Sequence, residues 1–419
     1  MPALAEPSCA EPVAVVGAGL SGLCCAAHLH AAGAPVVVLE RADRVGGRVV
    51  TDEREGFLLD RGFQVLLTSY PEVQATLDLD ALGLAAFRPG SAVRFDDRTC
   101  TIADPFREPW TAVNALRTPL LSVSDALRSF TLRRRLLKGR LPPGRARDVL
   151  AASGISEDLL ARFYRPFFQG VTLDPALGVP ADYFAFLFRM FAQGAATLPR
   201  GGMGAVPQQL ADRLPAGSVR LGAAVAAVGA DHVTLEGGER LGARQVVVAV
   251  EGRSAAELVD VAPPAADRST TCVYFAVEGP PPCNDRMLTL NGAGAGRLLH
   301  LCVPSVVQPS YAPDGQHLVS VTLLGAHGDE VASSLRTELR TWFGDDVSSW
   351  RHLHTAAVAH ALPALDTDQP VMQRTGARRL ESGVVACGDY LATPSIQGAM
   401  AAGRRAAELV LEGAAQATA

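Results

Sequence analysis

Three glycines near the start of the chain have the spacing G-x-G-x-x-G: Gly17, Gly19 and Gly22. A short apolar run (13–16, VAVV) precedes them, and small residues typical of a helix follow, beginning with Leu20 and Ser21. In such a turn the first glycine permits the tight bend, the second lets the backbone approach a pyrophosphate, and the third lets helix and strand pack closely. The helix N-terminus adds N–H groups and partial positive charge. We therefore predict a dinucleotide site, with a chance glycine turn as the alternative.

A second apolar run, 36–40 (VVVLE), ends at Glu40, whose carboxylate can accept hydrogen bonds from ribose hydroxyls. The same carboxylate would repel a 2′-phosphate, which disfavours NADP. The segment RADRVGGRVVT, which begins at Arg41, then brings the backbone close a second time at Gly46-Gly47 and supplies a cation at Arg48. An ordinary loop and a surface cation are the alternatives for these last two features.

Several segments together resemble the flavin-containing amine oxidase and phytoene desaturase superfamily, which includes protoporphyrinogen oxidase. They are GAGLSG (17–22), Glu40, GGRVVT (46–51) and the D-x-G of residues 60–62. The segment 384–407 resembles the closing motif of that family, and LPRGGMGAVPQQLADRL (198–214) resembles its GGM turn and helix. Residues 162–177 and 182–194 resemble the desaturase-like members more than the eukaryotic monoamine oxidases.

The resemblance implies that FAD is the cofactor and assigns it a set of contacts. The GGR loop would touch the phosphates, Asp389 the ribityl or pyrophosphate portion, and Val225 the adenine or its ribose. The helix that starts near Ile396 would face the pyrimidine end of the flavin, and Gly62 would let the chain pass close to the ring. The expected cofactor residues are Gly17, Gly19, Leu20, Ser21, Gly22, Glu40, Arg41, Gly46, Gly47, Arg48, Gly62, Phe63, Gln64, Val225, Gly388, Asp389, Ile396, Gln397 and Ala399.

Two features of the family are missing from the chain. Many amine oxidases place a lysine near the flavin, but the only lysine here, Lys138, lies far from any matching motif. That places amine oxidation and rapid use of oxygen in doubt. The cysteine that tethers flavin in monoamine oxidases has no counterpart, so we expect FAD to be bound without a covalent bond.

No catalytic residue is identified from the sequence, and two candidates remain. His360 lies in AHALPALD (359–366), which resembles a family segment that enters the flavin site, and Tyr390 follows Gly388-Asp389 directly. Tyr390 could equally be a packing residue, and for His360 a satisfied surface or core histidine is the preferred interpretation. His352 and His354 alternate along an expected strand, but no further ligands are placed to join them, and we expect no metal.

The pattern of elements predicts an α/β fold. Strand, helix and strand over 13–16, 20–32 and 36–40 form a β-α-β unit, which implies a parallel sheet. Aromatic and arginine content rises over 86–200, which predicts a largely helical insertion with helices over 120–138 and 182–193. Further strands are expected over 245–250, 270–277, 297–303, 317–324 and 384–389, and helices over 329–343 and 395–412.

The resemblance implies a two-domain, Rossmann-like FAD-binding fold of the glutathione-reductase type with a mixed-sheet plus helical substrate domain. The expected FAD-binding domain is discontinuous and comprises 1–85, 198–265 and 360–419. The expected substrate domain comprises 86–197, with the helical insertion, and 266–359.

Composition limits the class of protein. Of the 419 residues, 48% are hydrophobic and 19% charged, which excludes a disordered chain. The net charge of −5 gives no reason to expect nucleic acid. Eight cysteines without a C-x-x-C pair fit a reducing compartment. No targeting segment and no apolar run of about 18 residues is found, so we expect a soluble, cytoplasmic protein of unknown oligomeric state.

A basic run stands out in this acidic chain: Arg133, Arg134, Arg135, Lys138, Arg140, Arg145 and Arg147. A solvated helix face is the preferred interpretation, with contact to anionic lipid or to an acidic partner as alternatives. The aromatic stretches nearby either line an apolar substrate tunnel or form core, and core is preferred. A membrane-docking face is a third possibility.

These observations predict an FAD-dependent oxidoreductase of the desaturase or dehydrogenase type, which removes hydride from a small, apolar or mid-sized organic substrate. One alternative is an amine or amino-acid oxidase that produces peroxide. Another, of a different class, is a non-catalytic prenyl-binding protein with a fold like that of GDP-dissociation inhibitors. The three intact FAD-contacting motifs argue against a pure binding protein.

Overall fold

The chain packs into two units, each assembled from segments that are far apart in sequence. The computed structural model describes residues 11–109, 118–139, 141, 143–365, 367 and 369–418. Unit 1 comprises Met1–Val49, Val206–Pro264 and Arg374–Ala419, and unit 2 comprises Val50–Ala205 and Ala265–Gln373. The functional domain boundaries expected from the sequence stay a prediction, because packing units need not coincide with functional ones. Of the features singled out above, Arg140 and the first ten residues lie outside the described residues.

Unit 1 contains the predicted β-α-β motif as β1 (Val13–Val16), α1 (Leu20–Ala31) and β2 (Val36–Leu39). In the described chain these strands belong to a six-stranded sheet with the order β10-β2-β1-β14-β21-β20, which is parallel except for β20. Every residue of β1 is buried, as expected for a central parallel strand covered on both faces. The other strands and the helices of this unit are β10 (Val219–Arg220), β14 (Gln245–Val248), β20 (Ala377–Arg379), β21 (Val385–Cys387), α10 (Gly252–Leu258) and α13 (Ile396–Thr418), with α9 (Ala205–Ala211) leading into it.

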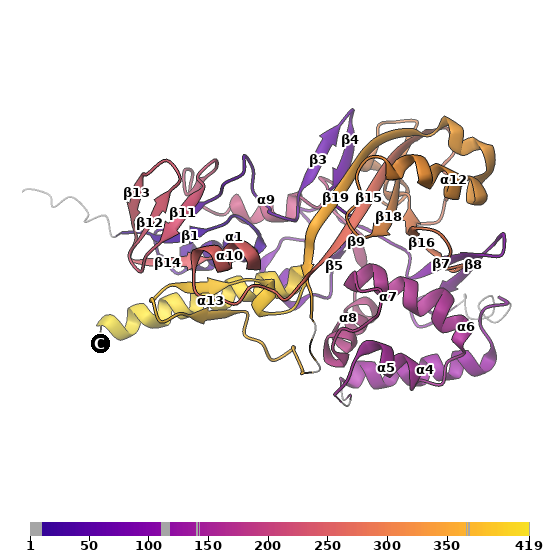
Figure 1. Ribbon diagram of the computed structural model, residues 1–419, viewed down its shortest axis with the longest axis horizontal. Coiled ribbons are helices and arrows are strands. Elements are labelled where there is room, and N and C mark those ends of the chain that lie inside the picture. The colour runs from indigo at the N-terminus through magenta and orange to yellow at the C-terminus, as the bar shows by residue number, and fades with distance from the viewer. Residues whose placement is uncertain are drawn as a thin grey trace, which may run out of the picture. The chain divides into compact units, whose positions relative to one another are not determined.

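The first and last helices of the chain pack against each other in unit 1 (Figure 1). A Cβ on Gly403 of α13 would lie 2.2 Å from the carbonyl oxygen of Ser21 in α1, so only glycine allows this approach. A small antiparallel sheet of β11 (Val225–Val228), β12 (His232–Leu235) and β13 (Arg240–Gly242) completes the unit. The motifs at the two ends of the sequence are therefore held in one packed body.

Unit 2 is built on a seven-stranded sheet with the order β19-β15-β18-β17-β16-β7-β8 over the residues described. All neighbours are antiparallel except β16 and β7. The long strands β15 and β19 run side by side in Figure 1. The strands of this sheet are β7 (Gly90–Phe95), β8 (Arg98–Ala103), β15 (Asp267–Glu278), β16 (Leu288–Asn291), β17 (Leu298–Cys302), β18 (Gln316–Leu324) and β19 (Arg351–Pro363).

Each face of this sheet has its own buried cluster. The predicted helix over 329–343 is α12 (Val331–Phe343), and its Val331, Leu335 and Leu339 pack with Phe275 and Val321 on one face. The other face carries Cys272 and Tyr274, which pack with residues of a hairpin of β3 (Thr51–Arg54) and β4 (Phe57–Asp60). The remaining short strands are β5 (Leu66–Leu67), β6 (Ala85–Ala86) and β9 (Ala196–Leu198).

The helical part of unit 2 includes both helices expected from the sequence, α4 (Val123–Lys138) and α8 (Ala181–Gln193). Other helices of unit 2 are α2 (Pro71–Thr76), α5 (Ala146–Ala151), α6 (Glu157–Leu159), a π-helical turn (Leu160–Tyr164), α7 (Arg165–Thr172) and α11 (Pro304–Val307), the last of which packs on β18. Within the described segments, no helix has both the length and the apolar character needed to cross a bilayer.

The expectation of a largely helical stretch over 86–200 is wrong for residues 90–103, which form the hairpin β7–β8. Phe95 pairs with Arg98, so Asp96 and Asp97 make a two-residue turn, and both have positive φ (47° and 56°). That conformation suits the right-handed twist of a hairpin and is accessible to aspartate. The Asp96-Asp97 turn was the signal for a hairpin that the sequence analysis missed. Aromatic and arginine content does not distinguish the periodicity of a helix from that of a strand.

Candidate functional site

The three glycines of the first motif in unit 1 have three different reasons to be glycine. Gly17 has φ +103°, a conformation that L side chains rarely adopt. A Cβ on Gly22 would lie 1.9 Å from the carbonyl oxygen of Gly17. A Cβ on Gly19 would meet nothing within 4 Å. The fold therefore requires glycine at positions 17 and 22. Gly19 is the N-cap of α1; it has no capping side chain and leaves open space at the N-terminus of the helix.

Glu40 is attached to this turn by its side chain. One carboxylate oxygen accepts a hydrogen bond from the N–H of Ala18 (2.8 Å) and the other from the N–H of Ala42 (2.9 Å). Its backbone also accepts one from Ala223, two residues before the strand that begins at Val225. The structure thus brings together the glycine turn, the acidic strand end and the segment expected near the adenine.

The second glycine loop lies directly on the first. The N–H of Gly46 donates to the carbonyl of Ala18 (2.8 Å), and a Cβ on Gly47, whose φ is +60°, would lie 3.4 Å from the Cα of Gly19. The next residue, Arg48, donates to Asp389 at 2.7 Å across 341 positions of sequence. The carboxylate of Asp389 is nearly buried, so this charged hydrogen bond fixes the closing motif on the glycine loop.

The residues after Asp389 form a turn that leads into α13. The Ser395 hydroxyl accepts from the N–H of Gly398 (3.0 Å) and so caps the first turn of the helix, which contains Ile396, Gln397 and Ala399. Tyr390 packs its ring on the apolar cluster that contains Val246 and Ala386, and burial raises the pKa of its phenol. Its hydroxyl is buried without a hydrogen-bond partner. The candidate role of Tyr390 stays a prediction.

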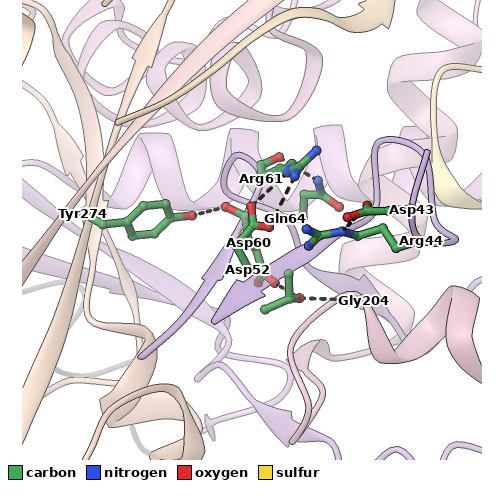
Figure 2. Close-up of polar contacts among 9 residues, drawn as sticks. Asp43, Arg44, Asp52, Asp60, Arg61, Gln64, Gly204 and Tyr274 are labelled. Atoms are coloured by element: carbon green, nitrogen blue, oxygen red, sulfur yellow. Dashed lines mark hydrogen bonds and ion pairs between the residues drawn. The ribbon is translucent and has the colours of Figure 1, made fainter. Parts of the chain in front are cut away.

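In unit 2 the D-x-G segment is organised by a buried carboxylate. Asp60 accepts hydrogen bonds from the Thr51 hydroxyl (2.5 Å), the Met203 N–H (2.9 Å) and the Tyr311 hydroxyl (2.8 Å). Its own carbonyl accepts from Tyr274 (2.6 Å), as Figure 2 shows. Burial raises the pKa of Asp60 to about 6, although these three hydrogen bonds favour the charged form.

The residues that follow Asp60, 61–64, make contacts of their own. Arg61 forms an ion pair with Asp52 (2.9 Å), and the Gln64 side chain donates to the Arg61 carbonyl (3.0 Å; Figure 2). Gly62 has φ +85°, and a Cβ there would contact only two methyl groups at 3.6 Å. The Phe63 ring lies edge-on to His300, 5.1 Å between centroids.

Sequence analysis missed His300. It lies in β17, is 2% exposed, and its Nδ1 has no hydrogen-bond partner. Burial lowers its pKa to about 3, so the imidazole is neutral. A Cβ on Gly170 of α7 would lie 2.9 Å from its ring. The signal was a single polar residue in an otherwise apolar strand, LLHLC.

His360, by contrast, is exposed on β19 and pairs with Asp267 (2.7 Å between Nδ1 and Oδ2). Its acid–base role stays a prediction. His352, on the same strand, is within 2.9 Å of the Thr355 hydroxyl, and burial lowers its pKa. Over the described ranges, no three His, Cys, Asp or Glu side chains are placed to hold a metal ion.

The expected cofactor residues divide between the units. Gly62, Phe63 and Gln64 belong to unit 2, as does His360. The others belong to unit 1: Gly17, Gly19, Leu20, Ser21, Gly22, Glu40, Arg41, Gly46, Gly47, Arg48, Val225, Gly388, Asp389, Ile396, Gln397 and Ala399, together with Tyr390. Arg41 is exposed, beside Glu40.

Residues 20–411 match the family model described as flavin containing amine oxidoreductase. The chain belongs to this family. It is an FAD-dependent oxidoreductase, and the expectation of an enzyme with an FAD cofactor is confirmed. The non-catalytic prenyl-binding alternative is therefore not retained.

Individual proteins are similar to different extents. Coproporphyrinogen III oxidase of Propionibacterium freudenreichii is 26% identical over 79% of this chain and 77% of that protein. Phytoene desaturase (lycopene-forming) of Pantoea ananas is 46% identical, but over only 13% of this chain and 11% of that protein. An oxidoreductase of known structure from Methanosarcina mazei has a TM-score of 0.72 with 18% identity, and the match covers 96% of this chain and all of that one. That last likeness shows the shared fold.

The residues present in unit 1 fit FAD. The open space at Gly19 would admit the pyrophosphate, Glu40 keeps acceptor capacity for ribose hydroxyls, and Asp389 with Arg48 offers polar partners beside the second loop. Among the three glycines of the first motif, Gly19 is the one where a Cβ would meet no protein atom beyond its chain neighbours. A pyrophosphate bound at this turn would account for glycine there.

Proposed function

We propose that this enzyme is a dehydrogenase of the desaturase type, which takes hydride from a C–H bond of an apolar or mid-sized organic substrate and leaves a new double bond. The substrate loses two electrons and a hydrogen as hydride, and a second hydrogen leaves as a proton. Bound FAD supplies the acceptor for that hydride. The protein must hold the substrate in place and exclude water.

The observation that carries the proposal is the place of the single lysine. Lys138 lies in the last turn of α4, exposed, on a helix that holds none of the expected cofactor residues. No other lysine exists in the sequence to take the position that many amine oxidases fill beside the flavin. Consistent with this, the relative that is 26% identical over 79% of the chain is named as an oxidase of coproporphyrinogen III, not of an amine.

Three buried side chains of unit 2 show what this unit could offer a neutral group of the substrate. On the sheet face opposite α12, the Cys272 thiol contacts the Ser320 hydroxyl (3.0 Å) and Tyr274 donates to a backbone carbonyl. Both side chains are thus satisfied within the protein. His300 differs from these two residues, because its buried Nδ1 lacks a partner and its ring is neutral. A neutral imidazole can hydrogen-bond a substrate N–H or carbonyl without a charge to balance.

Anaerobic reduction of the purified, FAD-loaded protein tests the proposal. Coproporphyrinogen III, phytoene, putrescine and an L-amino-acid mixture would each be added, and loss of the yellow absorbance of oxidised flavin followed. We expect reduction by the porphyrinogen or the polyene and none by the amines. Reduction by putrescine or an amino acid, with peroxide formed on admitting air, would overturn the proposal in favour of an amine oxidase.

A further inference from the structure

The outward side of α4 carries an apolar stripe. Val123 and Leu127 are each 64% exposed and Phe130 is 41% exposed, and their spacing of four and three residues places them on one side of the helix. The opposite side is the buried one, with Asp125, Leu132 and Leu136. In Figure 1, α4 runs along the margin of the helical part of unit 2.

A second segment extends this stripe. Phe106, in the loop after β8, is 54% exposed, and its ring stacks on that of Phe130 with 5.8 Å between centroids and 20° between planes. We call Phe106, Val123, Leu127 and Phe130 the apolar patch. Four of the six large hydrophobic side chains exposed among the described residues belong to it. Exposed apolar residues scattered singly are ordinary, but a contiguous group marks an interaction site.

Cations border the apolar patch. Arg128, Arg134, Arg135 and Lys138 are exposed on α4. Arg133 lies over the Phe106 ring (4.5 Å) and pairs with Asp104 (3.1 Å), while Arg134 lies over Phe130 (5.9 Å).

The helix is therefore strongly cationic for this protein. It has five cationic residues, at positions 128, 133, 134, 135 and 138, and one acidic residue, Asp125, a net charge of +4 within a chain of net charge −5. Asp125 is buried and hydrogen-bonded to Ser122 and Ser156, so it does not offset the charge of the outward side.

We infer that this surface docks the enzyme on an anionic lipid membrane. An apolar stripe bordered by Lys and Arg is the arrangement of helices that lie in the membrane interface, with the apolar side at the boundary of headgroups and acyl chains. The cations then lie at the level of the lipid phosphates. Because the rest of the protein is acidic, an anionic surface orients it with this side down. Two copies of the chain would bring two cationic helices together, which disfavours this surface as a dimer interface.

Vesicle sedimentation of the FAD-loaded protein tests the inference. The probes are vesicles of phosphatidylcholine alone and of phosphatidylcholine with phosphatidylglycerol, at low and high salt. We expect binding to the anionic vesicles that weakens with salt, because exposed charges are screened. Equal binding to both compositions, or none to the anionic ones, would overturn the inference.

Two sets of variants separate the contributions. Arg134→Gln, Arg135→Gln and Lys138→Gln together should lower partitioning roughly a hundredfold, at about fivefold per charge. Leu127→Ser with Phe130→Ser should lower it at least tenfold at the same charge. The matched controls are Arg340→Gln on α12 and Leu221→Ser, which is 46% exposed in unit 1; both should bind as the parent does.

Retained FAD and an unchanged thermal transition show that each variant is folded. If the controls lose binding as much as the patch variants do, the patch is not the docking surface. A parent protein that dimerises, and that becomes monomeric with Leu127→Ser and Phe130→Ser without having bound lipid, would identify a second copy as the occupant and overturn the inference.

Discussion

Gly19 can carry a side chain without disturbing the chain around it, which makes it the position where fit to the cofactor can be separated from fit to the fold. Its backbone is extended, with φ −77° and ψ 179°, a conformation open to any L residue. Apart from its chain neighbours, no protein atom lies within 4 Å of a Cβ built there. Gly19→Val should therefore lower the free energy of unfolding of the cofactor-free protein by no more than about 1 kcal/mol, the scale of a substitution at a helix N-cap.

The effect on FAD should be much larger. If the pyrophosphate approaches this turn, the valine side chain occupies its place and removes at least one backbone N–H contact to a charged group. Such a hydrogen bond contributes about 1.5–3 kcal/mol, which corresponds to roughly 10- to 150-fold in the dissociation constant. Steric exclusion adds to this, so we expect Gly19→Val to be isolated colourless.

The assay is a titration of cofactor-free protein with FAD, followed by quenching of flavin fluorescence, together with thermal unfolding of each variant. Gly237→Val is the matched control, because Gly237 also has open space around its Cβ but lies in the turn between β12 and β13. Gly22→Ala is the opposite case, since its Cβ would lie 1.9 Å from the Gly17 carbonyl oxygen and should destabilise the fold itself.

One result would refute the reasoning: a Gly19→Val protein that binds FAD as tightly as the parent does. The open space at Gly19 would then have no connection with the pyrophosphate. Loss of FAD with equal loss of thermal stability in the cofactor-free state would also count against it, because the side chain would then have clashed with protein.

Three further predictions concern other parts of the site. Glu40→Ala should weaken FAD binding by about 1–3 kcal/mol in the same titration, and unchanged binding would remove Glu40 from the ribose site. Asp60→Asn tests the buried carboxylate. The pKa of Asp60 is raised to about 6 in the folded state, above an unfolded value of about 3.9. The contribution of Asp60 to the free energy of unfolding is therefore full below pH 4 and is lost as the pH rises through 6. The parent should therefore lose roughly 2–3 kcal/mol of unfolding free energy between pH 4 and 7 relative to Asp60→Asn, and parallel pH profiles of urea unfolding would contradict this. FAD should leave the protein on mild acid denaturation, and flavin that stays with the chain through gel filtration in denaturant would show a covalent bond.

Local pattern was enough to predict the first part of unit 1. The apolar runs and the glycine spacing act within a few residues of one another, and β1, α1 and β2 follow them closely. The closing helix was predicted for the same reason. The packing of this helix on α1 through Gly403 could not be predicted from hydrophobic periodicity alone. A glycine inside a helix can also simply lower the stability of that helix.

The hydrogen bonds around Asp60 could not be predicted from the sequence, because the residues that form them are far apart along the chain. Asp60 and Tyr311 are 251 positions apart, and the Met203 contact uses a backbone N–H that any residue has. The sequence offered a carboxylate beside a glycine and gave no sign that it would be buried. His300 could not be predicted for a different reason. A single histidine in an apolar strand can be a core residue whose ring nitrogens are both hydrogen-bonded, or one whose ring nitrogen has no partner.

The number of charged residues on α4 does not determine which of its side chains are exposed. From the sequence, the basic run was interpreted as a solvated helix face, which accounts for Arg134, Arg135 and Lys138. Helical period alone does not say which side of a helix faces the protein when both sides carry leucines. In the structure Leu132 and Leu136 are buried and Leu127 is exposed. The exposed side of α4 is therefore an apolar stripe bordered by cations and not only a basic face.

The two ends of the chain meet in unit 1 through contacts of two kinds. Gly403 allows α13 to lie against α1, and Arg48 holds Asp389 by a charged hydrogen bond. FAD bound across these same segments would add its binding free energy to the contacts that hold the last helix on the first, because a ligand that binds only the folded state stabilises it. Unit 2 has its own buried clusters on both faces of its sheet and does not depend on that joint. Cofactor binding is therefore expected to stabilise unit 1 in particular, where the segments to be joined are separated by most of the chain.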